Sequence, residues 1–105
     1  MSLAKVDDAQ FSEALKSNDK VIVKFYADWC GSCRLMAPKY KKLAAKEEYA
    51  DVAFLDVNAE ESPEARKSAG VYNLPFFAAF KGGELVEGSS AGKIDFVEKL
   101  IEKIS

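Results

Sequence analysis

The sequence predicts an α/β fold of three layers, in which a central mixed sheet of five strands lies between about four helices. Segments rich in β-branched and aromatic residues alternate with amphipathic segments along the chain, an order typical of parallel strands joined by helical crossovers. In addition, the pair Gly82-Gly83 stands between two strand-like segments, which indicates a hairpin. The sheet is therefore expected to combine parallel and antiparallel strands.

Four segments in the first half are predicted to form regular elements: a strand at Leu3–Val6, a helix that begins at Asp7 or Asp8 and ends at Asn18-Asp19, a strand at Val21–Ala27 and a helix over Leu35–Glu48. The first helix is supported by Phe11, Ala14 and Leu15, which recur at helical spacing. Pro38 is expected to kink the second helix, because it removes one backbone donor and clashes with the preceding turn.

Five segments in the second half complete the order βαβαβαββα: a strand at Val52–Val57, a helix from Ser62-Pro63 to Gly70, strands at Phe76–Phe80 and Glu84–Glu87, and a helix over Lys93–Ile104. The strand Phe76–Phe80 is apolar without alternation, which is typical of a central strand covered on both faces. In the last helix, Ile94, Val97 and Ile101 make an apolar stripe.

Length and composition favour one globular domain over residues 1–105. A chain of 105 residues can bury about two-thirds of its unfolded surface, and 49% of the residues are hydrophobic. A net charge of −2 is too small to indicate nucleic-acid binding, and one lysine cluster is interpreted as a solvated helix face: Lys39, Lys41, Lys42 and Lys46. The apolar stretch Phe76–Phe80 is far shorter than a membrane span.

Cys30 and Cys33 are the only cysteines, and the chain has no histidine. They lie between the predicted strand Val21–Ala27 and a helix, so Cys30 is placed where unpaired backbone N–H groups stabilise a thiolate. At helical spacing Cys33 lies on the same face, close enough for the two sulfur atoms to bond. The pair is therefore predicted to open and close reversibly.

Three other interpretations of the cysteine pair are open. A structural disulfide across so small a loop would contribute only about 2 kcal/mol. A structural zinc site needs four ligands, usually cysteine or histidine, of which the chain offers two. Finally, two cysteines can occur at this spacing by chance as small buried apolar residues. The preceding strand and the following helix favour the redox interpretation.

The segment Phe25–Arg34 reads FYADWCGSCR, which resembles the F-W-A-x-W-C-G-P-C-K/R motif of the thioredoxin family. Pro38, Pro75 and the hairpin sequence Phe80–Gly83 also match that family, and the resemblance covers nearly the whole chain. It implies the thioredoxin fold and a thiol-disulfide oxidoreductase that reduces client protein disulfides. Cys30 would be the nucleophile and Cys33 the resolving thiol.

The same resemblance implies a client-binding surface. The Leu74–Pro75 peptide bond should be cis with Pro75 facing Cys30, although the residues alone fit an ordinary turn proline equally well. The backbone of Leu74 would pair with an extended client segment, and Trp29, Gly31 and Leu74 would form the flat surface that receives it. For Trp29, half-buried packing is an equally weighted interpretation.

The resemblance further implies no bound cofactor or metal, only a redox-active disulfide that a thioredoxin reductase regenerates with electrons from NADPH. Its clients would be proteins such as peroxiredoxins, methionine sulfoxide reductases or ribonucleotide reductase. The protein would be a monomer that serves electron transport and cell redox homeostasis without binding nucleic acid or membrane.

Met1–Asp8 lacks the apolar core of a signal peptide, which favours the cytoplasm unless residues 1–3 replace a removed leader. A disulfide oxidase or isomerase of an oxidising compartment, or a non-catalytic binding module, is the alternative.

The chain departs from the family at the two positions of a buried charge pair. Lys24 matches the buried aspartate of the family, and Asp56 matches the lysine partner of bacterial members. If their strands are parallel neighbours, Lys24 and Asp56 could pair, whereas the alternative is that Lys24 extends to water. As a pair, Lys24 would favour the thiolate of Cys33, and Asp56 would relay the proton that resolution requires.

Other departures flank the site. Ser32 replaces the usual proline and adds donors near Cys30, which favour the thiolate and predict a less reducing couple than a Ser32→Pro variant would have. Phe76 and Phe77 stand where the family has threonine and an apolar residue, so they would either make a bulkier groove wall or fill the core. The family's glycine before the last helix aligns with Ala91 or Gly92, which leaves that loop's geometry open.

Overall fold

The computed structural model describes residues 3–105 and contains the predicted order of strands and helices. The elements are β1 (Leu3–Lys5), α1 (Asp8–Ser17), β2 (Lys20–Tyr26), α2 (Gly31–Ala44), the 3₁₀ helix η1 (Glu47–Tyr49), β3 (Ala53–Asn58), α3 (Pro63–Ala69), β4 (Phe76–Lys81), β5 (Glu84–Ser90) and α4 (Ile94–Lys103). Among the described helices, none combines the length and the apolar composition that crossing a bilayer requires.

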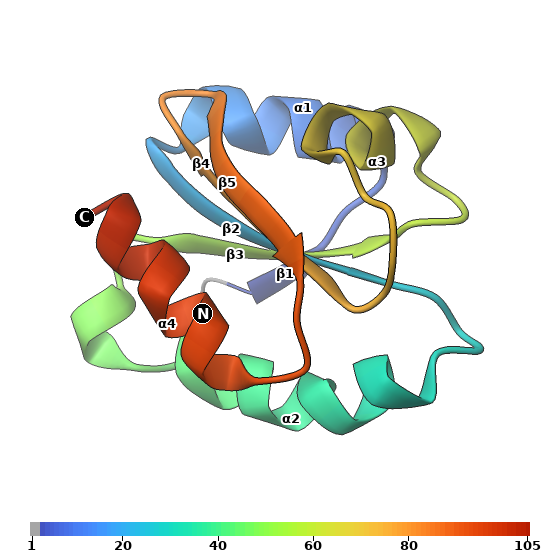
Figure 1. Ribbon diagram of the computed structural model, residues 1–105. Coiled ribbons are helices and arrows are strands. Elements are labelled where there is room, and N and C mark those ends of the chain that lie inside the picture. Colours follow the sequence, from blue (N-terminus) through green and yellow to red (C-terminus); the bar gives the residue numbers. More distant parts are fainter. Residues whose placement is uncertain (1–2) are drawn as a thin grey trace.

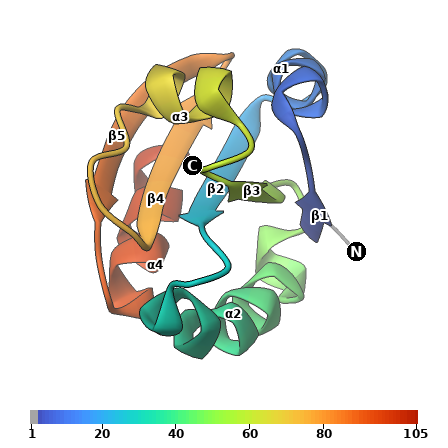
Figure 2. The ribbon, with the colours of Figure 1, turned by 90° about the vertical axis from the view of Figure 1, so that its right-hand side faces the viewer.

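The five strands form one mixed sheet in the order β1-β3-β2-β4-β5. The three strands β1, β3 and β2 are parallel, whereas β4 is antiparallel to both of its neighbours. Helices α1 and α3 cover one face of the sheet, and α2 and α4 cover the other (Figures 1 and 2). The predicted three-layer α/β architecture is confirmed. Because β2 and β3 are parallel, their carboxyl ends meet at the edge where α2 begins.

The central strand β4 contributes to the core on both faces of the sheet. Phe77 packs with Tyr40 of α2, and Phe76 packs with Phe25 on the opposite face. Both phenylalanines are fully buried, so their bulk fills the core and makes no groove wall. A Cβ atom at Gly88 of β5 would lie 2.9 Å from the ring of Phe76, which explains why the neighbouring strand has a glycine there.

The helices around the cysteine pair differ from the prediction at their ends. Instead of running from Leu35 to Glu48, α2 begins at Gly31 and ends at Ala44, and η1 follows as a separate 3₁₀ turn. Pro38 lies inside α2, as predicted. The pattern of lysines and small apolar residues continues past Ala44, so it could not indicate where the helix ends.

The amino ends of α1 and α3 are held by neighbouring aspartates. Asp7 is the N-cap of α1, since its carboxylate accepts a hydrogen bond from the Gln10 N–H at 2.8 Å. Asp8 accepts hydrogen bonds from the N–H groups of Glu64 and Ala65 at 3.1 and 2.9 Å, and so joins α1 to α3. Ser62 is the N-cap residue of α3, where the sequence predicts the helix to begin, but its side chain makes no capping hydrogen bond, and the carboxylate of Asp8 accepts the hydrogen bonds of the first turn instead.

Candidate functional site

Cys30 and Cys33 form a disulfide at the point where β2 leads into α2. Cys30 is the N-cap of the helix, and its Sγ accepts a hydrogen bond from the Cys33 N–H at 3.1 Å. An unpaired N–H of the first helical turn therefore points at the sulfur that would carry negative charge in a thiolate. The predicted placement of the pair at a strand-to-helix junction is confirmed.

Both cysteines are buried, with exposed fractions of 5% for Cys30 and 2% for Cys33. They pack with Ala27, and Tyr26 and Leu74 cover this small cluster. A nucleophilic thiol is expected to be exposed, but in the closed disulfide the strand end and the Leu74 segment enclose Cys30. Gly31 and Ser32, which follow Cys30, are exposed, and a Cβ at Gly31 would meet nothing within 4 Å.

The segment before β4 borders the disulfide. The Leu74–Pro75 peptide bond is cis, as predicted, and Leu74 packs against the cysteine cluster. The carbonyl oxygen of Pro75 accepts a hydrogen bond from the Ala91 N–H at 3.2 Å, which ties the loop before α4 to this segment. Ala91 is one of the two residues that align with the family's glycine before the last helix, and this hydrogen bond places it beside the cis proline. The facing of Pro75 toward Cys30 stays a prediction.

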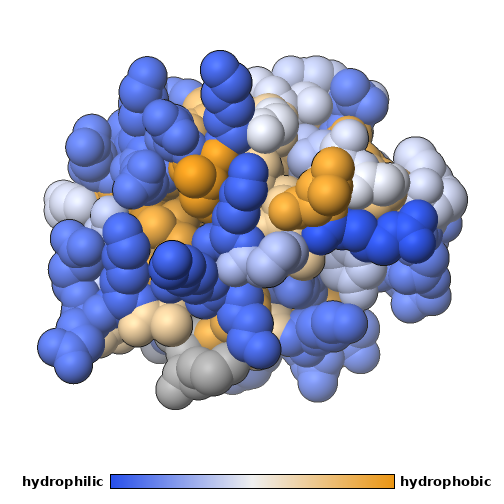
Figure 3. Space-filling model, turned by 90° about the horizontal axis from the view of Figure 1, so that it is seen from below, coloured by the Kyte–Doolittle hydropathy of each residue, from blue (hydrophilic) through white to orange (hydrophobic). Residues whose placement is uncertain are grey.

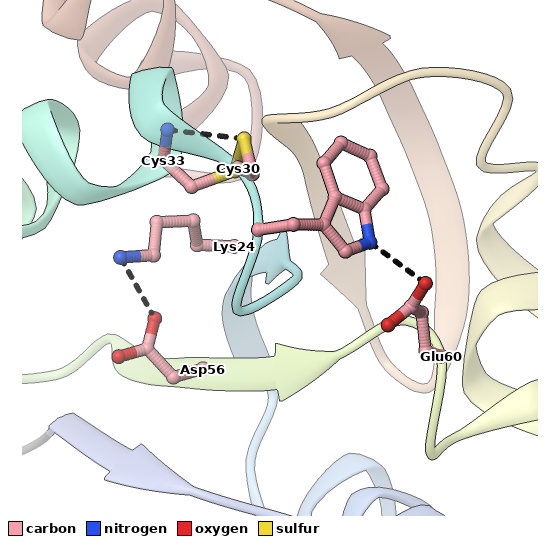
Figure 4. The surroundings of a disulfide bond; sticks show 6 residues. Lys24, Cys30, Cys33, Asp56 and Glu60 are labelled. Carbon is pink, nitrogen blue, oxygen red and sulfur yellow. Dashed lines mark hydrogen bonds and ion pairs between the residues drawn. A yellow bond between two sulfur atoms is a disulfide. The ribbon is translucent and has the colours of Figure 1, made fainter.

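Trp29 is 66% exposed, so the interpretation as half-buried packing is wrong. Its indole Nε1 donates a hydrogen bond to Glu60 Oε2 at 2.7 Å (Figure 4). No motif in the sequence indicated Glu60 as part of the site. The signal was available, because Trp29 follows β2 and Glu60 follows β3, and the carboxyl ends of parallel neighbours lie at the same edge of a sheet.

Lys24 and Asp56 face each other in the register of β2 and β3 and form an ion pair, with Lys24 Nζ 3.4 Å from Asp56 Oδ1. The Lys24 side chain is only 4% exposed, so the alternative in which it extends to water is wrong. Burial raises the pKa of Asp56, although the charges of Lys24 and Lys5 act in the opposite direction. The contact lacks the alignment of a hydrogen bond, and Asp56 Oδ1 accepts none from the described residues.

Two tyrosines surround the ammonium group of Lys24, which lies 5.3 Å from the ring centre of Tyr40 and 5.8 Å from that of Tyr26. Aromatic faces attract cations, so these rings partly replace the lost hydration of the ammonium. The Tyr40 hydroxyl lies 3.1 and 2.9 Å from the carbonyl oxygens of Ile22 and Leu55. Burial, with a smaller contribution from Asp56, raises the pKa of Tyr40 well above its usual value, so Tyr40 stays neutral.

A pocket of about 420 Å³ connects the buried pair with the disulfide. Its lining includes Cys33, Lys24, Asp56 and, closer to the surface, Lys5 and Arg34. In Figure 4, Lys24 lies between the disulfide and Asp56. A proton could therefore pass between the resolving cysteine and the carboxylate through water in this pocket. Within residues 3–105, no three Cys, Asp or Glu side chains are grouped in a way that could hold a metal ion.

A family model described as Thioredoxin matches residues 2–105. The mitochondrial thioredoxin-3 of Saccharomyces cerevisiae is 39% identical over 77 residues, which cover 73% of this chain and 59% of that protein. A thioredoxin of Alicyclobacillus acidocaldarius is 40% identical over 81 residues, or 76% of this chain and 75% of that protein. The solved structure of oxidised yeast mitochondrial thioredoxin 3 superposes with a TM-score of 0.85 at 34% identity, covering 97% of this chain and 95% of the other.

Proposed function

The chain belongs to the thioredoxin family, and from this premise we propose that it is a protein-disulfide reductase that uses Cys30 and Cys33. The single observation that carries the proposal is the disulfide at the amino end of α2, with a backbone N–H directed at Cys30 Sγ. The cis proline segment beside it adds support. A purely structural role explains the disulfide less well, because a disulfide that closes a loop of only a few residues stabilises the fold little.

The reaction has two thiol–disulfide exchange steps. In the dithiol form, the Cys30 thiolate attacks one sulfur of a client disulfide, forms a mixed disulfide and releases the other client sulfur as a thiolate. Cys33 then loses its proton and attacks Cys30 Sγ, which releases the second client sulfur and closes the Cys30–Cys33 disulfide. The client gains two electrons and the protein loses two. The N–H of Cys33 stabilises negative charge on Cys30 at the start of the first step.

Four residues around the disulfide are proposed to receive the client. Trp29 and Gly31 are exposed beside Cys30, and Leu74 and Pro75 precede the buried strand β4. An extended client segment would pair with the backbone of Leu74, since main-chain pairing tolerates many client sequences. The hydrogen bond from Trp29 to Glu60 fixes the orientation of the indole before the client arrives.

Asp56 is proposed to accept the proton of Cys33 through the shared pocket, with Lys24 favouring the Cys33 thiolate by its charge. Asp56→Asn is expected to lower the rate of client reduction by about tenfold, which is less than the roughly 10²–10⁴-fold of a base in direct contact because the transfer passes through water. The wild-type rate should fall as acidification protonates Asp56, and it should do so at a higher pH than for an exposed aspartate, because burial raises its pKa.

The measurement is the pH profile of single-turnover reduction for both proteins. In Asp56→Asn, the acid limb due to this carboxylate should be missing. Glu61→Gln serves as the matched control, because it removes an exposed carboxylate that follows β3 at the same edge of the sheet and lies outside the pocket. A profile of Asp56→Asn that coincides with that of the wild type would rule out the relay.

The partners and the compartment are proposed on family resemblance alone. A thioredoxin reductase that draws on NADPH would reduce the disulfide again, and the protein would act as a cytoplasmic monomer. The matched relatives include a protein named as mitochondrial, so membership of the family is compatible with more than one compartment. The chain also spans only part of that relative's length.

Insulin reduction by dithiothreitol provides the test of the proposed function. The protein at micromolar concentration is expected to accelerate the precipitation of reduced insulin chains, which is followed by turbidity. The control is the same protein after its reduced thiols have been blocked with iodoacetamide. Equal rates with and without the active protein would show that the chain is a binding module that keeps the fold without turnover.

A further inference from the structure

Helix α2, which begins at the disulfide, has an unusual charge. The 16 residues from Gly31 to Lys46 contain five of the 15 basic residues of the chain and none of its 17 acidic residues. The four basic residues within α2 itself are all exposed: Arg34, Lys39, Lys41 and Lys42. The protein as a whole has a net charge of −2, so α2 is a positively charged element of a slightly acidic protein.

The basic residues of α2 are not neutralised by ion pairs. In the part of the chain that the structure describes, the ion pairs involve Lys20, Lys24 and Lys103, none of which belongs to α2. One carboxylate, Glu98 of α4, borders a hollow of about 200 Å³ together with Lys39 and Lys42, but it forms no ion pair with them. Figure 3, which shows the molecule from the side of α2 and α4, is hydrophilic over much of its surface. The positive charges of the basic side chains on α2 therefore face the solvent.

The basic residues of α2 begin next to the redox site. Arg34 follows Cys33 directly, and Lys39 lies nine residues after Cys30, or roughly 14 Å along the helix axis. The positive end of the helix dipole is also at Cys30. At low ionic strength the screening length is about 30 Å, so these charges act on a molecule that approaches the disulfide, whereas at about 1 M salt it is only about 3 Å.

We propose that the basic face of α2, defined as Arg34, Lys39, Lys41 and Lys42, attracts client proteins whose surface next to the reactive disulfide is acidic. This inference rests on the proposed reductase function and names the class of client that the site selects. Complementary charges raise the association rate more than they prolong the complex, so the selectivity should be in the second-order rate constant. Clients with basic surroundings would be reduced more slowly.

The test uses two synthetic disulfide peptides that are identical except at four flanking positions, which are glutamate in one and lysine in the other. At about 10 mM ionic strength, the wild-type protein is expected to reduce the acidic peptide about tenfold faster than the basic one. At about 0.5 M NaCl, the ratio of the two rate constants should approach one, because the charges are then screened.

Two double variants locate the effect. Lys39→Gln with Lys42→Gln should lower the acidic-to-basic ratio about threefold at low ionic strength. The control, Lys16→Gln with Lys67→Gln, removes the same charge from exposed positions on α1 and α3, which cover the opposite face of the sheet, and should change the ratio much less. Circular dichroism confirms that all variants are folded.

The outcomes separate the two proposals. A ratio that does not respond to salt, or equal losses in the two double variants, would overturn the role of α2 while leaving the reductase function intact. If the wild-type protein reduces neither peptide, the proposed function itself fails.

Discussion

Replacing Cys33 with serine is expected to stop turnover and to trap the protein as a mixed disulfide with its client. The Cys30 thiolate is still made and still stabilised by the backbone N–H at position 33, so the first exchange proceeds. No second thiol is then present to attack Cys30 Sγ, because the chain has only two cysteines. With protein that has been reduced and freed of reductant, nearly all client-bound material should be a one-to-one adduct, measured by mass spectrometry under non-reducing conditions.

Cys30→Ser is the matched control, and it should form far less adduct. The remaining thiol, Cys33, lies inside α2 and lacks the N-cap position at which Cys30 Sγ accepts a backbone hydrogen bond. Digestion of the Cys33→Ser adduct should locate the client sulfur on Cys30. If Cys30→Ser formed the adduct as readily as Cys33→Ser, the assignment of nucleophile and resolving thiol would have to be reversed.

Features set by local patterns were predictable from the sequence. The alternation of strand and helix segments indicated the parallel part of the sheet, and Gly82-Gly83 indicated the hairpin between β4 and β5. The unbroken apolar run of β4 indicated a strand covered on both faces, which its burial confirms. The cysteine pair at the start of α2 was predictable for the same reason, since the strand and helix patterns adjoin at that point.

Contacts between residues distant in the sequence were not predictable in this way. The cap that Asp8 provides for α3 joins residues 56 and 57 positions apart, and no local pattern indicates which aspartate reaches that helix. The orientation of Trp29 depends on Glu60, 31 residues away. The pairing of Lys24 with Asp56 was an exception, because two departures from one family motif fell on neighbouring strands.

The burial of Cys30 also could not be predicted from the sequence motif, because it depends on tertiary packing. The position of Cys30 at a helix start is local, but its exposed fraction depends on how the Leu74 segment packs over the disulfide. The Leu74 segment is joined in turn to the loop before α4 by the hydrogen bond from the Ala91 N–H to the Pro75 carbonyl, so three parts of the chain meet near the disulfide. Access to the nucleophile is thus a property of the tertiary structure, whereas its chemistry is indicated by the motif.

Replacing Lys24 with methionine is expected to destabilise the protein by about 3 kcal/mol at neutral pH, because it leaves the carboxylate of Asp56 largely buried without its nearest counter-ion. Methionine is an unbranched side chain of similar length that fills the same space, so the loss reports charge more than packing. Burial already holds the pKa of Asp56 above its usual value, and Lys24 opposes that shift. Without Lys24 the pKa of Asp56 should rise further.

The raised pKa of Asp56 determines how the stability of Lys24→Met should change with pH. A carboxyl group whose pKa is higher in the folded than in the unfolded state stabilises the fold at low pH, and this contribution is lost as the pH rises through the folded pKa. The deficit of Lys24→Met in urea unfolding should therefore be largest near pH 7 and smaller at about pH 4, because a carboxyl group with a raised pKa has largely taken up its proton by the usual pKa of an aspartate. Adding Asp56→Asn to Lys24→Met should abolish this pH dependence, since asparagine cannot ionise.

The exchanged variant, Lys24→Asp with Asp56→Lys, should keep most of the wild-type stability, because a pair of opposite charges remains between β2 and β3. A deficit in Lys24→Met that is the same at both pH values would show that the lost free energy comes from packing and not from the charge of Asp56.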